Sequence, residues 1–469
     1  MYNIVKNEWQ ALIHNKRLTG LLGGITLLLV VIAYFGVQDA RIGQDKKQQA
    51  KEQIRQQWES IGDYNPHGAA HFGTYTFKPT TALTALDNGI NNTVGTVLQL
   101  EGHRQNEIIH SPDSQSLMQS RFGTLKPAVV LQFIIPLLLI FLAFASVSSE
   151  KEQGRLKLLV MQGVSTRKLL FAKAISYWII GVGILILALG IQLMLFAGDL
   201  HADIVYRMLL LFLFYSLFYW IVCAVTVYLS AALKNNTAAL TSMLALWVIW
   251  AIFLPKIAGA ISEETHPLPS RQAFSTAMQE DRSKGIDGHN PLSEQEEKLK
   301  DSILQVYNVE TVDDLPINFD GLVMQADEDF GSKVWDKHFG ALDAILEQQK
   351  KTFQWSGLIN PFASLQSLSM GLAGTDNWHH THFKQEAETY RRVFIKTLND
   401  KHAYGGSKTG DWGWTTDQEF YNSVADFDYE TPYIKHALPV YKTDMALMGL
   451  WFFGSFFLLL FGKSKNTLS

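Results

Sequence analysis

Residues 127–147 read PAVVLQFIIPLLLIFLAFASV, a run without one charged side chain. An α-helix rises about 1.5 Å per residue, so roughly 20 apolar residues cross the hydrocarbon core of a bilayer. Five further largely apolar blocks of similar length lie at residues 18–37, 174–198, 208–233, 238–261 and 441–462. We therefore predict an all-α polytopic membrane protein with six transmembrane helices.

Averages over the whole chain conceal this pattern. The 469 residues are 47% hydrophobic and 18% charged, and the mean hydropathy is only +0.04, which would suit a soluble protein. The net charge of -4 shows no basic excess of the kind that binds nucleic acid. A single cysteine, Cys223, excludes a disulfide-rich secreted fold. The apolar content also excludes a disordered chain.

Lysine and arginine gather on one set of connecting segments. Residues 1–17, 148–173, 234 and 463–469 together hold twelve Lys or Arg side chains against three Glu. Since basic loops stay in the cytoplasm, both termini are predicted to be cytoplasmic. The first 17 residues then form an amphipathic helix on that side, and residues 463–469 form a short tail.

The two long segments, residues 38–126 and 262–440, are accordingly predicted to lie outside. The first continues the helix of its membrane block as a polar helix over residues 44–60. The second is strongly acidic and mostly helical, with amphipathic patterns at residues 362–372 and 383–398. The sequence thus predicts a large, mostly helical extracytoplasmic domain.

The loop at residues 148–173 has the most informative pattern. It begins with Glu150 and Glu152, continues through Gly154, and then alternates apolar and basic residues. Charges next to leucines keep such a segment at the membrane surface. We predict a short interfacial helix here.

This pattern resembles the cytoplasmic coupling helix of permeases in the type-2 ABC exporter family (ABC-2), and we therefore call residues 148–173 the coupling loop. That helix has an acidic start, a Glu-x-Gly-x-Leu core and a later Ser-x-Arg-like turn before a lysine, which is Lys173 here. The chain departs from the pattern at Gly163, where the family often has proline, and by an extra Thr166. The resemblance implies these ATPase-coupling residues: Glu150, Glu152, Gly154, Arg155, Leu156, Leu158, Leu159, Met161, Ser165 and Arg167.

The stretches at residues 65–79 and 360–369 are similar to a bacterial branch of these permeases with a large uncharacterised extracytoplasmic domain. The resemblance implies an exporter permease of the bacterial inner membrane that is not itself an enzyme. ATP and Mg²⁺ would be held by two copies of a cytoplasmic ABC ATPase, which would dock on residues 150–161 and on residues 2–14. A second permease chain, identical or related, would complete the transporter, while the cargo cannot be read from the spans.

Two other functions stay open. The chain could be a membrane-anchored receptor or scaffold whose outer domain binds a partner, or a metal-dependent membrane enzyme. The second idea depends on two histidine groups: His67 with His71, and His379 with His380 and His382. No cysteine joins either group, and no HExxH pair or nucleophile elbow occurs. We therefore assign no catalytic, cofactor-binding or metal-binding residues and keep these histidines as candidates.

Overall fold

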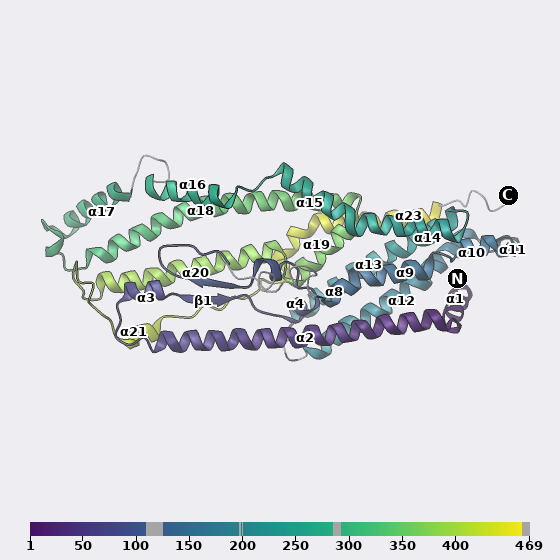
Figure 1. The fold of residues 1–469 in the computed structure, drawn as a ribbon, viewed down its shortest axis with the longest axis horizontal. Helices are drawn as coiled ribbons and strands as arrows, with labels where there is room; N and C mark the ends of the chain where they lie inside the picture. The colour runs from purple at the N-terminus through teal and green to yellow at the C-terminus, as the bar shows by residue number, and fades with distance from the viewer. Residues whose placement is uncertain (109–124, 197, 199, 285–291, 462–469) are drawn as a thin grey trace.

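The computed structural model describes residues 1–108, 125–196, 198, 200–284 and 292–461. The molecule is elongated, with a helical bundle at one end and a second set of long helices at the other (Figure 1). The predicted fold class is confirmed: the described residues contain six helices that are long and apolar enough to cross a membrane. Our predictions for residue 462 and for the tail 463–469 lie outside the described residues. The six candidate spans are Lys16–Glu59, Pro127–Glu152, Thr166–Leu195, Ala202–Ala232, Asn236–Thr265 and Ile434–Phe461.

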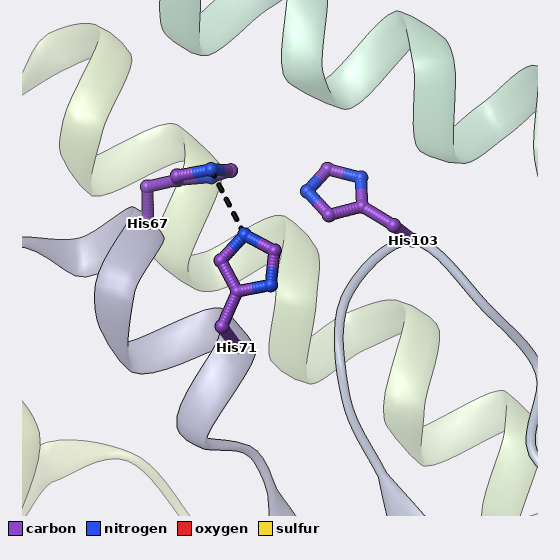
Figure 2. Close-up of side chains that lie close together, drawn as sticks. All are labelled: His67, His71 and His103. Carbon is purple, nitrogen blue, oxygen red and sulfur yellow. Dashed lines mark hydrogen bonds between the residues drawn. The ribbon is translucent and has the colours of Figure 1, made fainter.

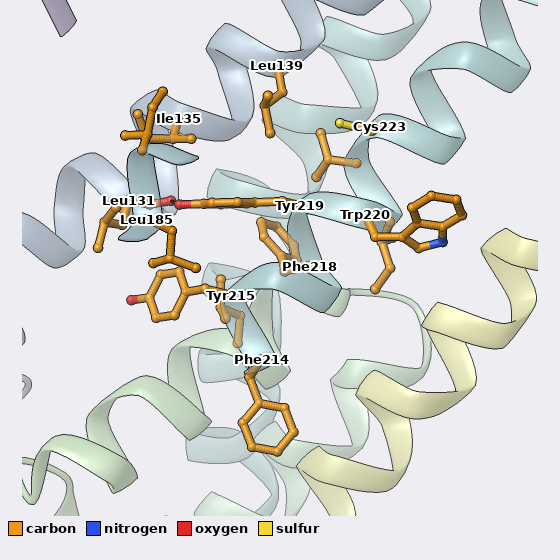
Figure 3. Close-up of a cluster of buried hydrophobic side chains, with 14 of the residues drawn as sticks. Leu131, Ile135, Leu139, Leu185, Phe214, Tyr215, Phe218, Tyr219, Trp220 and Cys223 are labelled. Carbon is orange, nitrogen blue, oxygen red and sulfur yellow. Dashed lines mark hydrogen bonds between the residues drawn. The ribbon is translucent and has the colours of Figure 1, made fainter. Parts of the chain in front are cut away.

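The bundle is built around α13 (Ala202–Ala232), the most enclosed of the spans. Its buried aromatic side chains pack against leucines and isoleucines of neighbouring helices, as Figure 3 shows for Tyr215, Phe218 and Tyr219. In a bilayer, close packing of this kind, rather than exclusion of water, holds helices together. The surrounding helices are α9 (Ile135–Ala143), α12 (Thr166–Leu195), α14 (Asn236–Val248) and α23 (Lys442–Phe461).

Two spans each contain a widened turn just before a proline. The π-helical turn η1 (Val130–Ile134) follows α8 (Pro127–Val129) and precedes Pro136. The second, η3 (Ile249–Phe253), precedes Pro255 at the start of α15 (Leu254–Thr265). Proline has no N–H and its ring crowds the carbonyl four residues earlier. The wider turn relieves that conflict, so both spans pass through their prolines as continuous helices.

One helix, α2 (Lys16–Glu59), belongs to both ends of the molecule. The Asn15 side chain caps its start by accepting from the backbone N–H groups of Arg17 and Leu18. At its far end Trp58 is buried against Phe394 and Tyr421, and its indole N–H donates to the Tyr421 carbonyl at 2.9 Å. The first span therefore extends without a break into the other half of the protein.

The half away from the bundle, which we call the head domain, combines residues from both long segments. Its two longest helices are α18 (Phe319–Trp355) and α20 (Asn377–Tyr404). Residues 58–70 share one buried core with residues 394–424, and Leu98 and Leu100 share another with Phe383. The two long segments thus form one packed unit.

The remaining helices are short, apart from α16 and α17 along the edge of the head domain (Figure 1). Strands β1 and β2 pair antiparallel, with Thr74 opposite Leu100 and Phe77 opposite Val97. The bounds of these elements are α3 (Pro66–Phe72), β1 (Thr74–Phe77), α4 (Ala82–Leu86), α5 (Asn91–Val94), β2 (Val97–Leu100), α16 (Arg271–Lys284), α17 (Leu292–Tyr307), η4 (Val312–Asp314), η5 (Ser356–Leu358), α21 (Gln418–Ser423), α22 (Ile434–Ala437) and η6 (Leu438–Tyr441).

Helix α19 (Pro361–Ala373) differs from its expected place on an outer amphipathic face. Nearly all of it is buried inside the bundle, where the Phe362 ring lies 4.9 Å from Phe133 and 5.7 Å from Trp247. The stretch has no charged residue, so neither face requires water. Small residues allow close approach, since a Cβ on Gly371 would lie 2.2 Å from the Tyr441 ring. The bundle therefore encloses a helix contributed by the second long segment.

Candidate functional site

The coupling loop contains two short helices, where a single one was predicted, and ends in the first turns of α12. Helix α10 (Ser148–Glu152) ends before Gly154, whose φ of +71° is left-handed, and α11 (Arg155–Met161) begins after it. A second left-handed residue, Gly163 with φ +84°, precedes the start of α12. Glycine adopts such angles without steric cost, whereas proline is fixed near -65°. The departure from the family's proline at Gly163 therefore matches a turn that proline cannot make.

Glu150 points into the protein and joins an ion-pair cluster. The ammonium of Lys173, only 2% exposed, donates to Glu8 Oε1 at 2.7 Å and to Glu150 Oε1 at 2.6 Å. The Tyr177 hydroxyl donates to the other oxygen of Glu8 at 2.7 Å. We call Glu8, Glu150 and Lys173 the clasp. It binds α1 (Tyr2–His14), α10 and α12 to one another.

Glu152 and Lys151 tie α10 to two further spans. The Glu152 carboxylate accepts from the backbone N–H of Asn236 at 2.9 Å and from its side-chain amide at 2.8 Å. These donors lie at the N-terminus of α14, where the helix dipole favours a negative charge. The Lys151 ammonium donates to the carbonyls of Ala231 and Leu233 at the C-terminal end of α13. Both charges thus complement the helix ends that they touch.

Helix α11 presents most of its side chains away from the bundle. Leu156 is buried and anchors α11, while Leu158 is 59% and Met161 83% exposed on its outer side. Arg155 and Lys157 are also exposed. We call the exposed side chains of Arg155, Leu158 and Met161 the α11 tip. An apolar surface with basic neighbours, held on a buried root, is a suitable contact for another protein.

The structure therefore divides the ten residues that the resemblance implied. Glu150, Glu152 and Leu156 make contacts within the chain, and Gly154 shapes the turn. Leu159 is half-buried, and Ser165 and Arg167 are exposed beside the start of α12. Sequence reasoning matched Lys173 to the family's motif but did not predict its ion pairs with Glu8 and Glu150. The available signal was a lysine at the border of an apolar block, which needs a partner.

The histidines of α20 do not converge. The Nδ1 atom of buried His379 lies 2.7 Å from Asp376 Oδ1, and His382 Nδ1 lies 3.1 Å from the Tyr429 hydroxyl. Desolvation lowers the pKa of His380 to about 3, so this ring is neutral. Among the described residues these three histidines do not form a group whose ligand atoms lie together. Each is instead placed in the packing of the head domain.

His67 and His71 do come together, and a third histidine joins them. They lie one turn apart on α3, with their Nε2 atoms 3.1 Å from each other (Figure 2). His103, from the turn after β2, completes a group whose ligand atoms all lie within 4.8 Å of one another. Sequence reasoning missed His103, because it lies far along the chain and nothing in its local pattern marks it.

Two models of known protein families match the chain. Residues 2–309 match the model of a family described as "ABC-2 family transporter protein". Residues 271–430 match a "Domain of unknown function (DUF3526)". No curated protein matches the chain. The first match covers well over half of the sequence and includes the clasp and the α11 tip, and the second covers α18 and α20 of the head domain.

Proposed function

Because the chain belongs to the ABC-2 family of transporter proteins, we propose that it is a permease subunit that couples ATP hydrolysis by a separate cytoplasmic ATPase to export of a cargo. The observation that carries the coupling is the construction of the coupling loop. The α11 tip is exposed, while the neighbouring helix α10 is bonded to the ends of several spans. ATP and Mg²⁺ would be held by the ATPase.

The contacts within the loop supply a route for movement. A partner that displaces α11 also displaces α10, since the two helices are separated by only Gln153 and Gly154. Through the clasp, α10 takes α1 and α12 with it, and through Glu152 and Lys151 it acts on the ends of α14 and α13. Displacement at the tip would tilt several spans together, in the manner of a rigid-body transition.

The side chains of the α11 tip indicate what kind of surface the partner must present. Leu158 and Met161 require an apolar groove, and Met adapts well to an irregular one. Arg155 and Lys157 favour carboxylates along its rim. Helix α1 lies at the same end of the bundle (Figure 1) and offers a second contact, since Tyr2 and Ile13 are exposed.

The proposal also includes the orientation of the chain in the membrane and the number of subunits in the transporter. The end that holds α1, α10 and α11 is basic, so we place it in the cytoplasm of a bacterium and the head domain outside the inner membrane. Two ATPases would act on two permease chains, as the resemblance implies. The face of α2 at Gly20 and Gly24 has open space for close contact with another helix.

Copurification from the native membrane tests this coupling. We expect an ABC ATPase to copurify with the wild-type chain, and the double variant Leu158→Asp with Met161→Asp to lose it. Val306→Asp is the matched control, because Val306 is 73% exposed on the head domain. Unchanged elution of all variants in detergent would show that they fold.

Two results would contradict the proposal. Retention of the ATPase by the double variant at the wild-type level would show that the tip is not the docking surface. Absence of any ATPase from the wild-type preparation would favour the receptor or scaffold function.

A further inference from the structure

Three imidazole rings meet at the surface of the head domain, outside everything that the permease mechanism uses. We propose that His67, His71 and His103 form a binding site for a late first-row divalent cation such as Zn²⁺. The inference depends on the arrangement of these rings and of the carboxylates behind them, and it is independent of the proposed coupling to an ATPase.

The spacing of the nitrogens fits tetrahedral coordination. Zinc binds imidazole nitrogens at about 2.0–2.1 Å, so two nitrogens on one ion lie roughly 3.3 Å apart. The Nε2 atoms of His67 and His71 already lie 3.1 Å apart, because a separation of four residues places both rings on one face of α3. All the ligand atoms lie within 4.8 Å of one another, so the third nitrogen has to approach by at most about 1.5 Å.

Carboxylates hold the third ring in a suitable orientation. The Nδ1 atom of His103 lies 3.6 Å from Asp327 Oδ2 and 3.5 Å from Glu328 Oε1. The other nitrogen is thereby left on the side that faces His67 and His71 (Figure 2). Histidines that bind metals commonly place their second nitrogen against a carboxylate in this way.

Those carboxylates are themselves fixed. Glu328 is buried and accepts from Arg391 Nη1 at 2.9 Å, and Asp327 accepts from Arg282 Nη2 at 2.9 Å. The support of His103 therefore extends into α16, α18 and α20. Such a framework restricts the ring before any ion arrives.

The backbone of His103 is also unusual. Its φ of +66° is left-handed, in a tight turn where Glu101 bridges to Arg104. A residue with a Cβ adopts this conformation only at a steric cost. The turn is held by a hydrogen bond from the His103 N–H to Glu328. Strain retained in this way is typical of functional positions.

Helix α3 is anchored as firmly on the other side. Asn65 caps it by accepting from the His67 N–H at 2.8 Å. The same side chain donates to the carbonyls of Trp412 and Trp414 at 3.0 Å. The Trp412 ring lies against His67, with the ring centres 5.6 Å apart. Two ligands and their platform are thus in place together.

The donor set indicates the kind of ion. Imidazole nitrogens suit Zn²⁺, Cu²⁺, Ni²⁺ and Co²⁺, whereas Ca²⁺ and Mg²⁺ prefer oxygen ligands. His71 is exposed, so a fourth position can be filled by water or by a group from a bound molecule. Binding replaces the hydrogen bond between His67 and His71, whose net contribution to stability is small.

Calorimetric titration of the full chain with Zn²⁺ tests the site. The protein is purified in detergent without a polyhistidine tag and stripped of metal. We expect one saturable equivalent, and we expect His71→Ala and His103→Ala each to weaken binding about tenfold or more. His436→Ala is the control, since His436 is also exposed but does not belong to this histidine group.

His71→Ala removes an exposed side chain, so we expect this variant to keep the fold. Its affinity for Zn²⁺ therefore tests the site directly. The proposal is overturned if the wild-type chain takes up no stoichiometric Zn²⁺, or if His71→Ala binds Zn²⁺ as tightly as the wild type. Copurification of an ATPase is expected to be unchanged in this variant, so failure here leaves the permease proposal intact.

Discussion

The clasp offers a sharp test of how the coupling loop is held. We predict that Lys173→Met destabilises the protein substantially. The ammonium bonds both Glu8 and Glu150 within 2.7 Å, and the two carboxylates are only 20% and 16% exposed. Without it, two like charges remain close together at a site with little water. Methionine preserves most of the side-chain volume, so the change removes mainly the charge.

The magnitude follows from this burial. Removing one partner of a buried ion pair costs about 3–5 kcal/mol. Since both glutamates keep some contact with water, we expect the lower end, about 3 kcal/mol. Domains of 150–250 residues lose roughly 2–4 °C in melting temperature per kcal/mol, and longer chains lose less. We therefore expect a decrease of about 5 °C.

The assay is thermal unfolding of the purified protein in detergent. Lys168→Met is the matched control, because Lys168 lies on the same helix but is exposed. Glu150→Gln alone keeps the pair between Lys173 and Glu8, and we expect a smaller effect. Combined with Lys173→Met, it removes one of the two repelling charges and should restore part of the lost stability.

The reasoning would be refuted if Lys173→Met melted like Lys168→Met. Strict additivity of the Lys173→Met and Glu150→Gln effects would also contradict it, because the two side chains would then not interact.

Two further predictions concern a buried carboxyl and a left-handed glycine. Burial raises the pKa of Asp87, although Ser369, Gln132 and the Gly89 N–H donate to its carboxyl group. A carboxyl with a raised pKa binds more protons in the folded state, so its contribution to stability falls as pH rises from the unfolded to the folded pKa. We expect Asp87→Asn to gain melting temperature relative to the wild type over this interval and the exposed Asp63→Asn to show no such trend. For Gly154, an added Cβ meets no atom within 4 Å, so Gly154→Ala should cost about 1–2 kcal/mol from the backbone alone. Gly183→Ala, in equally open space within α12, should be neutral or stabilising, and equal melting shifts for the two variants would rule out this explanation.

The six apolar blocks could be predicted from sequence because the constraint that creates them is local. A helix in a bilayer must bond its own backbone and expose apolar side chains to lipid, and residues 127–147 satisfy both conditions without any partner. The acidic start of the coupling loop and its glycine were recognisable for a similar reason, since they follow directly from a short pattern.

Features that depend on distant partners could not be predicted. The burial of α19 requires Phe133 and Trp247, and the clasp joins residues 165 positions apart. The sequence of residues 362–372 is equally compatible with an amphipathic surface helix until those neighbours are known. His103 reaches the other two histidines only through the fold of the head domain. In each case the decisive contact is tertiary.

Helix α2 has a mechanical consequence. At about 1.5 Å per residue, its 44 residues make a rod of roughly 66 Å. Near its far end, Lys47 donates to the Lys78 carbonyl, Arg55 to the Val424 carbonyl and Trp58 to the Tyr421 carbonyl. A lever of this length, turned by only 5° about its first residues, sweeps its tip through about 6 Å. These hydrogen bonds attach the head domain to that tip, so a small rotation of the first span becomes a large displacement of the head domain.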